Sequence, residues 1–155
     1  MKTSKYLDIG ITLLSILFSS AFGMMPATAE DTTINIELIG LRSQQGSIKV
    51  CLWQQKQGFP LCESGSTALK KADIQPGSSK VSVTFSGIPA GEYAVSAFHD
   101  ENNNGKMDRD VIRRPKEGIS LSNLTQISPA AMNFDSAKFS ANGITSISLK
   151  MFYLK

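Results

Sequence analysis

Apolar and polar residues alternate along several short runs of this chain. A period of two places successive side chains on opposite faces of a β-strand. After the first 30 residues, no window keeps a helical apolar period over three turns. The pattern predicts strands over 33–41, 47–53 and 80–85, a returning strand that carries Tyr93, Val95 and Ala97, and further strands over 137–140 and 144–154.

The run 47–53 alternates aliphatic residues with Lys49, Cys51 and Trp53. Ile48, Val50 and Leu52 share one face, and Cys51 and Trp53 share the opposite one.

Two long segments separate the predicted strands. The segment 54–79 is polar and rich in Gly and Pro, so we interpret it as a connection with one helical turn around 67–71. After His99, an acidic, Asn-rich stretch leads into an irregular segment over 111–134. Long ordered connections often carry function, so this second region is the first place to look for a site.

Six or seven strands without an internal repeat predict an all-β fold. An antiparallel sheet with one apolar face must bury it against another layer. We therefore expect one antiparallel β-sandwich, immunoglobulin-like or prealbumin-like, that forms a single domain over 30–155.

The first 29 residues have the three parts of an export signal. Lys2 and Lys5 precede an apolar run over 9–22, and Ala27-Thr28-Ala29 forms a small-x-small cleavage site. The alternative is a membrane anchor, but the run is shorter than the roughly 20 residues that a spanning helix needs. We predict cleavage before Glu30, no transmembrane segment in the mature chain, and a periplasmic or secreted protein.

Composition narrows the class of protein. The 155 residues are 41% hydrophobic and 19% charged, which is typical of a folded domain and not of a disordered one. The net charge is only +3, and the basic residues form no long stripe, so nucleic-acid binding is not expected.

Cys51 and Cys62 are the only cysteines. In an exported chain a pair is more often bridged than free, so we predict a disulfide; the alternative is two separate buried thiols. Such a bridge would stabilise the fold by about 3 kcal/mol in the chain-entropy model.

The stretch after His99 matches the front half of an EF-hand calcium loop. Asp100, Asn102, Asn104 and Asp108 supply oxygens at the first, third, fifth and ninth places, and Lys106 offers its carbonyl at the seventh. Gly105 stands at the sixth place, but the twelfth is a valine where the motif has a glutamate. We therefore expect weak Ca²⁺ binding, or else an Asn-Gly turn whose side chains bond their own backbone.

His99 is the only histidine. It is a weak candidate for a catalytic general base. A hydrolase could use His99 with the loop carboxylates, but no GxSxG-type nucleophile elbow accompanies it. We favour a histidine at a strand end that is hydrogen-bonded to the nearby loop. A closed zinc site is not expected, because one histidine and a bridged cysteine pair do not complete a tetrahedral ligand set.

Two other groups could bind an envelope component or a glycan. The basic residues Arg109, Arg113, Arg114 and Lys116 suit an anionic surface or polysaccharide, although the neighbouring acids nearly balance them, which favours a solvated loop. Trp53 is a candidate platform for sugar stacking, although a single Trp beside a disulfide is more often part of the core.

Three segments carry a family resemblance. GIPAGEYAVSAFHDENNNGKMD, RRPKEGISLSN and FDSAKF together resemble the uncharacterised bacterial family known as domain of unknown function 2141. The resemblance implies a small exported protein and no particular activity. The GxPxGxY hairpin is also similar to those of prealbumin-like modules, which by analogy indicates a binding or structural domain. We therefore expect an exported, noncatalytic β-sandwich with a role in the cell envelope; the alternative is a small periplasmic hydrolase that uses His99.

Overall fold

The computed structural model describes residues 31–154, so the predicted export signal lies outside the described residues. This part of the chain forms eight strands and one short helix. The elements are β1 (Thr32–Ile39), β2 (Ser47–Trp53), β3 (Lys70–Ile74), β4 (Lys80–Ile88), β5 (Gly91–Asp100), β6 (Gly118–Leu121), α1 (Phe134–Ala137), β7 (Phe139–Ala141) and β8 (Ile144–Lys150).

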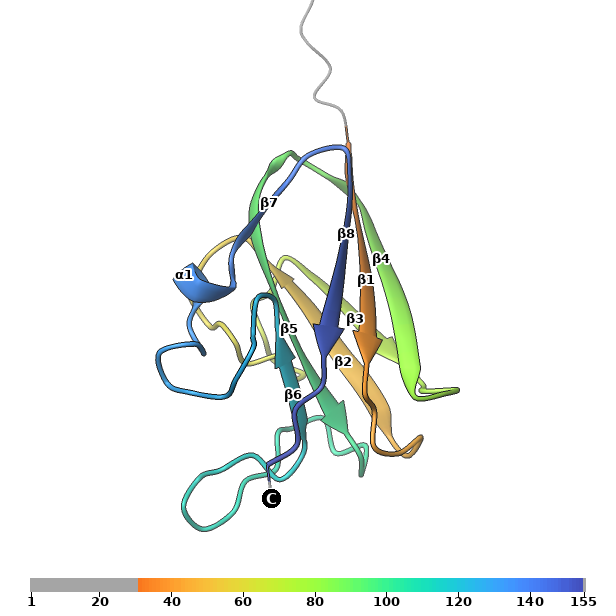
Figure 1. Ribbon diagram of the computed structural model, residues 1–155, viewed down its shortest axis with the longest axis vertical. Coiled ribbons are helices and arrows are strands. Elements are labelled where there is room, and N and C mark those ends of the chain that lie inside the picture. Colours follow the sequence, from red (N-terminus) through yellow and green to blue (C-terminus); the bar gives the residue numbers. More distant parts are fainter. Residues whose placement is uncertain (1–30, 155) are drawn as a thin grey trace, which may run out of the picture.

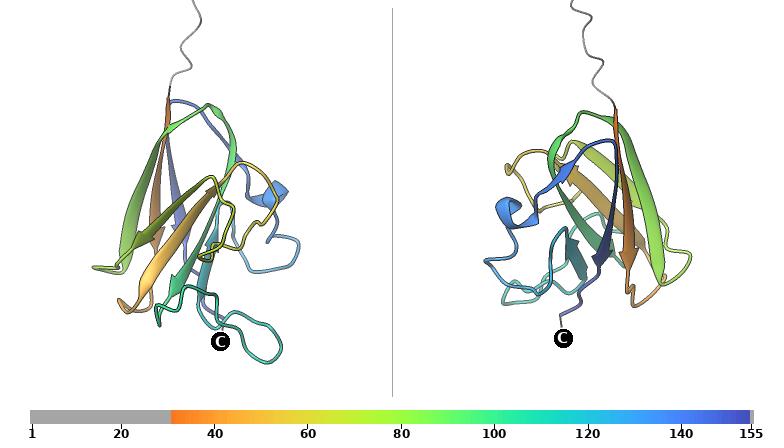
Figure 2. Two further views of the ribbon diagram at one scale, coloured as in Figure 1. Left: turned by 180° about the vertical axis from the view of Figure 1, so that it is seen from behind. Right: turned by 45° about the horizontal axis from the view of Figure 1, so that its top comes forward.

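The strands form two sheets that face each other (Figure 1). One sheet has the order β4-β1-β8, and the other has the order β3-β2-β5-β6 with β7 paired to the first part of β5. The two turned views in Figure 2 show the same two layers. The all-β prediction is confirmed.

Three details differ from the expected antiparallel sandwich of six or seven strands. β1 pairs with β8 in parallel, so one sheet is mixed. β3 lies where we expected a helical turn, and its exposed lysines hide the strand pattern at a sheet edge. β6 lies in the segment that we expected to be irregular. Its four residues are all buried, so no alternation of buried and exposed side chains marks it as a strand.

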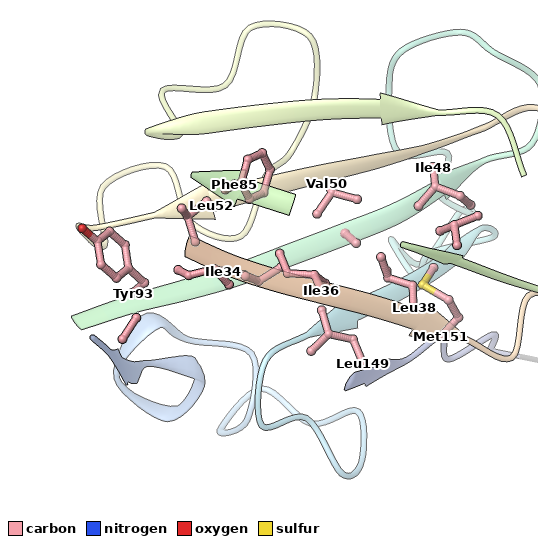
Figure 3. Close-up of a cluster of buried hydrophobic side chains, with 14 of the residues drawn as sticks. Ile34, Ile36, Leu38, Ile48, Val50, Leu52, Phe85, Tyr93, Leu149 and Met151 are labelled. Atoms are coloured by element: carbon pink, nitrogen blue, oxygen red, sulfur yellow. The ribbon is translucent and has the colours of Figure 1, made fainter. Parts of the chain in front are cut away.

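The main apolar cluster fills the space between the sheets (Figure 3). β1 contributes Ile34, Ile36 and Leu38, and β2 contributes the face that includes Val50 and Leu52. Burial of each such side chain stabilises the fold by about 1.5–3 kcal/mol. This cluster holds the two sheets together.

A second apolar cluster covers the outer face of the larger sheet. Cys51 and Trp53 from β2 lie in it, as does Phe98 from β5, and residues of the long connections, including Phe59 and Leu124, pack over them. β2 is therefore covered on both faces. The connections before β3 and after β6 therefore form a third layer over this face of the sheet.

Candidate functional site

The chemistry-bearing residues gather where β5 ends and the β5–β6 loop, residues 101–117, begins. His99 and Asp100 are the last residues of β5, and Glu117 immediately precedes β6. Because β5 and β6 pair through His99 and Gly118, both ends of the loop start from adjacent strands. The sheet therefore holds the base of the loop at a fixed width.

His99 is completely buried and uses both ring nitrogens. Its Nε2 lies 2.7 Å from the carbonyl oxygen of Gln45, and its Nδ1 lies 2.8 Å from the hydroxyl of Tyr153. A carbonyl oxygen only accepts, so Nε2 carries the proton and donates it. In the neutral ring, Nδ1 then accepts from the Tyr153 hydroxyl.

Tyr153 extends this chain of hydrogen bonds to the loop after β1. Its hydroxyl accepts from the backbone N–H of Arg42 at 3.2 Å, and the Arg42 guanidinium lies 4.5 Å from the ring centroid. Burial raises the pKa of Tyr153. Gly118 leaves room for the ring, because a Cβ at that position would lie 2.4 Å from the Tyr153 ring.

Arg42 also forms a two-point ion pair with Glu101, the first residue of the β5–β6 loop. The hydrogen bond from Arg42 lowers the pKa of Glu101, and a second hydrogen bond from Ser43 acts in the same direction. The pair fixes the start of the loop against the connection between β1 and β2.

Asp100 organises the turn that follows. Its carboxylate is fully buried and accepts from the backbone N–H groups of Asn104 at 3.0 Å and Gly105 at 2.8 Å. Lys49 on β2 places its Nζ 3.8 Å from the same carboxylate. Gly105 has a φ of +74°, which a residue with a side chain rarely adopts.

Asp108 closes the turn from the other side. Its two carboxylate oxygens accept from the side-chain amides of Asn102 at 2.7 Å and Asn104 at 3.1 Å. The backbone N–H of Lys106 donates to the Asn104 side chain at 2.8 Å. The structure thus brings all five residues of the expected calcium loop together, in the hydrogen-bonded arrangement of an Asn-Gly turn.

Glu117 is a third carboxylate at the base of this loop, and no sequence pattern singled it out. Its two oxygens accept from the backbone N–H groups of Glu101 and Asp108, each at 3.0 Å. Burial raises the pKa of Glu117, and the nearby charges of Asp108 and Asp100 raise it further. No motif spacing links Glu117 to the loop, since pairing of β6 with β5 brings it there.

Within residues 31–154, no group of three or more His, Cys, Asp or Glu side chains has a geometry suited to holding a metal ion. The donor types around Asp100 still suit Ca²⁺, which prefers carboxylate and carbonyl oxygens. In this structure, however, the Asn102 and Asn104 amides direct nitrogens toward Asp108.

The remaining candidates occupy the outer face of the larger sheet. Trp53 is buried and donates from Nε1 to the hydroxyl of Ser96 at 2.8 Å, so it is part of the core and cannot serve as an exposed stacking platform. Cys51 and Cys62 form a disulfide with a Cα–Cα distance of 5.6 Å. An apolar cavity beside Phe98 and Met107 has a volume of about 40 Å³, far below that of a typical small-molecule site.

The basic residues lie on a small hairpin, residues 108–116, that we call the tip hairpin. Arg109 and Pro115 form a bridge across it, and Lys116 N–H donates to the Asp108 carbonyl at 2.9 Å. Among the described residues, no helix is long and apolar enough to cross a membrane.

Comparison with known proteins identifies the family of this chain but no individual relative. A family model described as an uncharacterized protein conserved in bacteria (DUF2141) matches residues 36–148. No curated protein and no solved structure matches the chain. The matched segment includes β2 to β7 and the whole β5–β6 loop.

Proposed function

The chain belongs to the DUF2141 family of uncharacterized bacterial proteins, and we propose that it is an exported, noncatalytic binding module of the cell envelope. One observation carries the noncatalytic part of this proposal. His99, on which the hydrolase alternative depends, is fully buried, and Gln45 and Tyr153 occupy both of its ring nitrogens. A general base must reach the proton that it removes, and His99 has no free nitrogen to do so.

A panel of chromogenic ester, phosphoester and glycoside substrates tests this part of the proposal. We expect the purified protein to hydrolyse none of them above the uncatalysed rate. Its circular dichroism spectrum and its thermal transition would show that the sample is folded. Turnover that disappears in His99→Gln, while that variant still folds, would instead establish the hydrolase.

Export is supported by the small-x-small site before Glu30 and by the Cys51–Cys62 disulfide, which persists in oxidising compartments. The test is the intact mass of the protein recovered from a periplasmic fraction. We expect the mass of a chain that begins at Glu30 and lacks two hydrogens. A mass that includes Met1 would show that the segment is retained as an anchor.

We further propose that the base of the β5–β6 loop binds Ca²⁺ weakly. Glu117 would supply the carboxylate that the loop lacks at its twelfth place, since it lies at the same end of the sheet as Asp100 and Asp108. The charges of Asp108 and Asp100 act on Glu117, and a divalent cation bound by a rearranged loop would relieve that repulsion. When bound, Ca²⁺ would stiffen the loop.

Thermal unfolding with and without millimolar Ca²⁺ tests the calcium proposal. At a few times its dissociation constant, Ca²⁺ should stabilise the fold by about 1 kcal/mol, and Mg²⁺ should do less. Asp108→Ala should abolish the gain. Asp135→Ala is the matched control, because it removes an exposed carboxylate on α1 and should keep the gain. A melting temperature that Ca²⁺ does not move would show that the loop is a plain Asn-Gly turn.

A further inference from the structure

The tip hairpin is an ordered structure, although it extends from the sandwich (Figure 1). Asp110 accepts through Oδ1 from the backbone N–H groups of Ile112 at 3.0 Å and Arg114 at 2.9 Å. Arg114 returns a hydrogen bond from Nε to the same carboxylate at 2.8 Å. These bonds fix the turn and determine which side chains stand at its end.

The side chains at that end are apolar. Val111 is 100% exposed and Ile112 is 66% exposed. Single exposed apolar residues are common, but two adjacent β-branched residues held at the end of a fixed turn form a protruding apolar point. Neither side chain contributes to the apolar clusters of the sandwich.

The charge around this point is positive. The tip hairpin contains four basic side chains and two acids. Asp110 is paired with Arg114, and Asp108 accepts from the side-chain amides of Asn102 and Asn104. The sequence predicts that neighbouring acids nearly balance these charges. The structure places those acids elsewhere: Glu101 pairs with Arg42, and Asp100 and Glu117 are buried at the base of the loop.

We propose that the tip hairpin docks the protein on an anionic lipid bilayer, with Val111 and Ile112 entering the interface between headgroups and acyl chains. The flanking cations would contact the lipid phosphates. This inference rests on the proposed binding role and names its partner, and it does not depend on whether the loop holds Ca²⁺. Stable membrane attachment generally takes two signals, and this tip combines an apolar point with a basic rim.

A bilayer fits this surface better than a protein partner does. A stable protein interface buries about 800 Å² on each side, whereas the apolar part of the tip is two side chains. The tip also lies at the end of the sandwich opposite to the start of β1 (Figures 1 and 2). It can therefore meet a flat surface without obstruction by the first strand.

Cosedimentation with lipid vesicles tests the proposal, using the processed protein as it is purified from the expressing cell. The vesicles contain phosphatidylglycerol in phosphatidylethanolamine, and vesicles of phosphatidylcholine alone serve as the neutral comparison. We expect measurable binding only to the anionic vesicles. Raising the salt to about 1 M should abolish it, because the Debye length falls to about 3 Å.

Two variants separate the apolar and the basic contributions. Val111→Ser combined with Ile112→Ser should weaken binding about tenfold or more, since it removes the inserted side chains. Arg113→Gln combined with Lys116→Gln should weaken binding by about fivefold per cation. Both pairs of side chains are exposed, so the melting temperature should not change.

Matched controls remove equivalent groups elsewhere. Ile144 is 80% exposed, and it pairs with Thr33 at the far end of the sandwich, so Ile144→Ser should bind as the wild type does. Lys56→Gln combined with Lys70→Gln should likewise bind nearly as well as the wild type. Equal binding by the Val111/Ile112 variant, or tip-dependent self-association without vesicle binding, would overturn the proposal. Neither result would affect the substrate-panel and mass tests of the proposed function.

Discussion

The ring of His99 and the hydroxyl of Tyr153 are 2.8 Å apart, although 54 positions separate the two residues in the chain. His99 stands at the end of β5, and Tyr153 lies beyond the last strand, so this one hydrogen bond joins the larger sheet to the carboxyl-terminal segment. The Arg42 backbone and Gln45 add the loop after β1 to the same group. The histidine thus connects three segments that surround the base of the β5–β6 loop.

Tyr153→Phe should destabilise the protein by about 1–3 kcal/mol, because it leaves the buried Nδ1 of His99 without a donor. Urea unfolding of the wild type and the variant measures the difference. The slope of the transition should stay the same, since the substitution exposes no additional surface on unfolding. Equal midpoints would mean that this hydrogen bond does not hold the segment in place.

Glu101→Gln should reduce the free energy of unfolding near neutral pH, because it removes the ion pair with Arg42. The loss should be only about 1 kcal/mol, because solvent screens part of that pair. The folded pKa of Glu101 lies below its ordinary value of 4.5, so the stabilisation from Glu101 is present above pH 4.5 and is lost as the pH falls through the folded pKa. The wild-type and variant stabilities should therefore converge as the pH falls through the folded pKa of Glu101.

Urea midpoints measured for both proteins across this range check the convergence. The raised pKa of Glu117 has the opposite effect on stability, since protonation of Glu117 begins at a higher pH and favours the fold. Both proteins contain Glu117, so its contribution cancels in the difference. A difference that grows on acidification would contradict the assigned role of the Arg42–Glu101 pair.

Replacing both Cys51 and Cys62 by alanine should destabilise the protein by about 2–4 kcal/mol. The bridge closes a short loop with a sequence separation of 11, and it lies in the second apolar cluster. Thiol titration of the unfolded, unreduced wild type should find no free thiol. Two free thiols in protein from the periplasm would show that the bridge does not form.

Alternation of apolar residues predicted β2, β4 and β5 well because each buries one side-chain face in the main cluster. β3 carries charge at a sheet edge, and β6 is buried throughout, so neither shows a clean period of two. The parallel pairing of β1 with β8 depends on contacts between the two ends of the domain, which no local pattern encodes.

The part of the candidate site whose residues lie close together in the sequence was predictable. The spacing of Asp100, Asn104 and Asp108 marked the loop, and the structure brings their side chains together. Glu117 and Tyr153 reach the site through strand pairing and chain return, so the sequence offered no signal for them. The positive charge of the tip hairpin could not be predicted for a related reason. The neighbouring acids Asp100, Glu101 and Glu117 form hydrogen bonds or ion pairs with other parts of the fold, which the local sequence does not show.

Carbethoxylation by diethyl pyrocarbonate tests the central claim, that His99 is a structural group and not a catalytic one. His99 is the only histidine, so peptide mass spectrometry of the protein without a histidine tag distinguishes modification of this ring from that of lysines and tyrosines. The buried ring should remain unmodified in the folded protein and should react once the protein is unfolded in urea. Rapid modification of His99 in the folded protein would show that reagents reach the ring, and it would contradict the noncatalytic account.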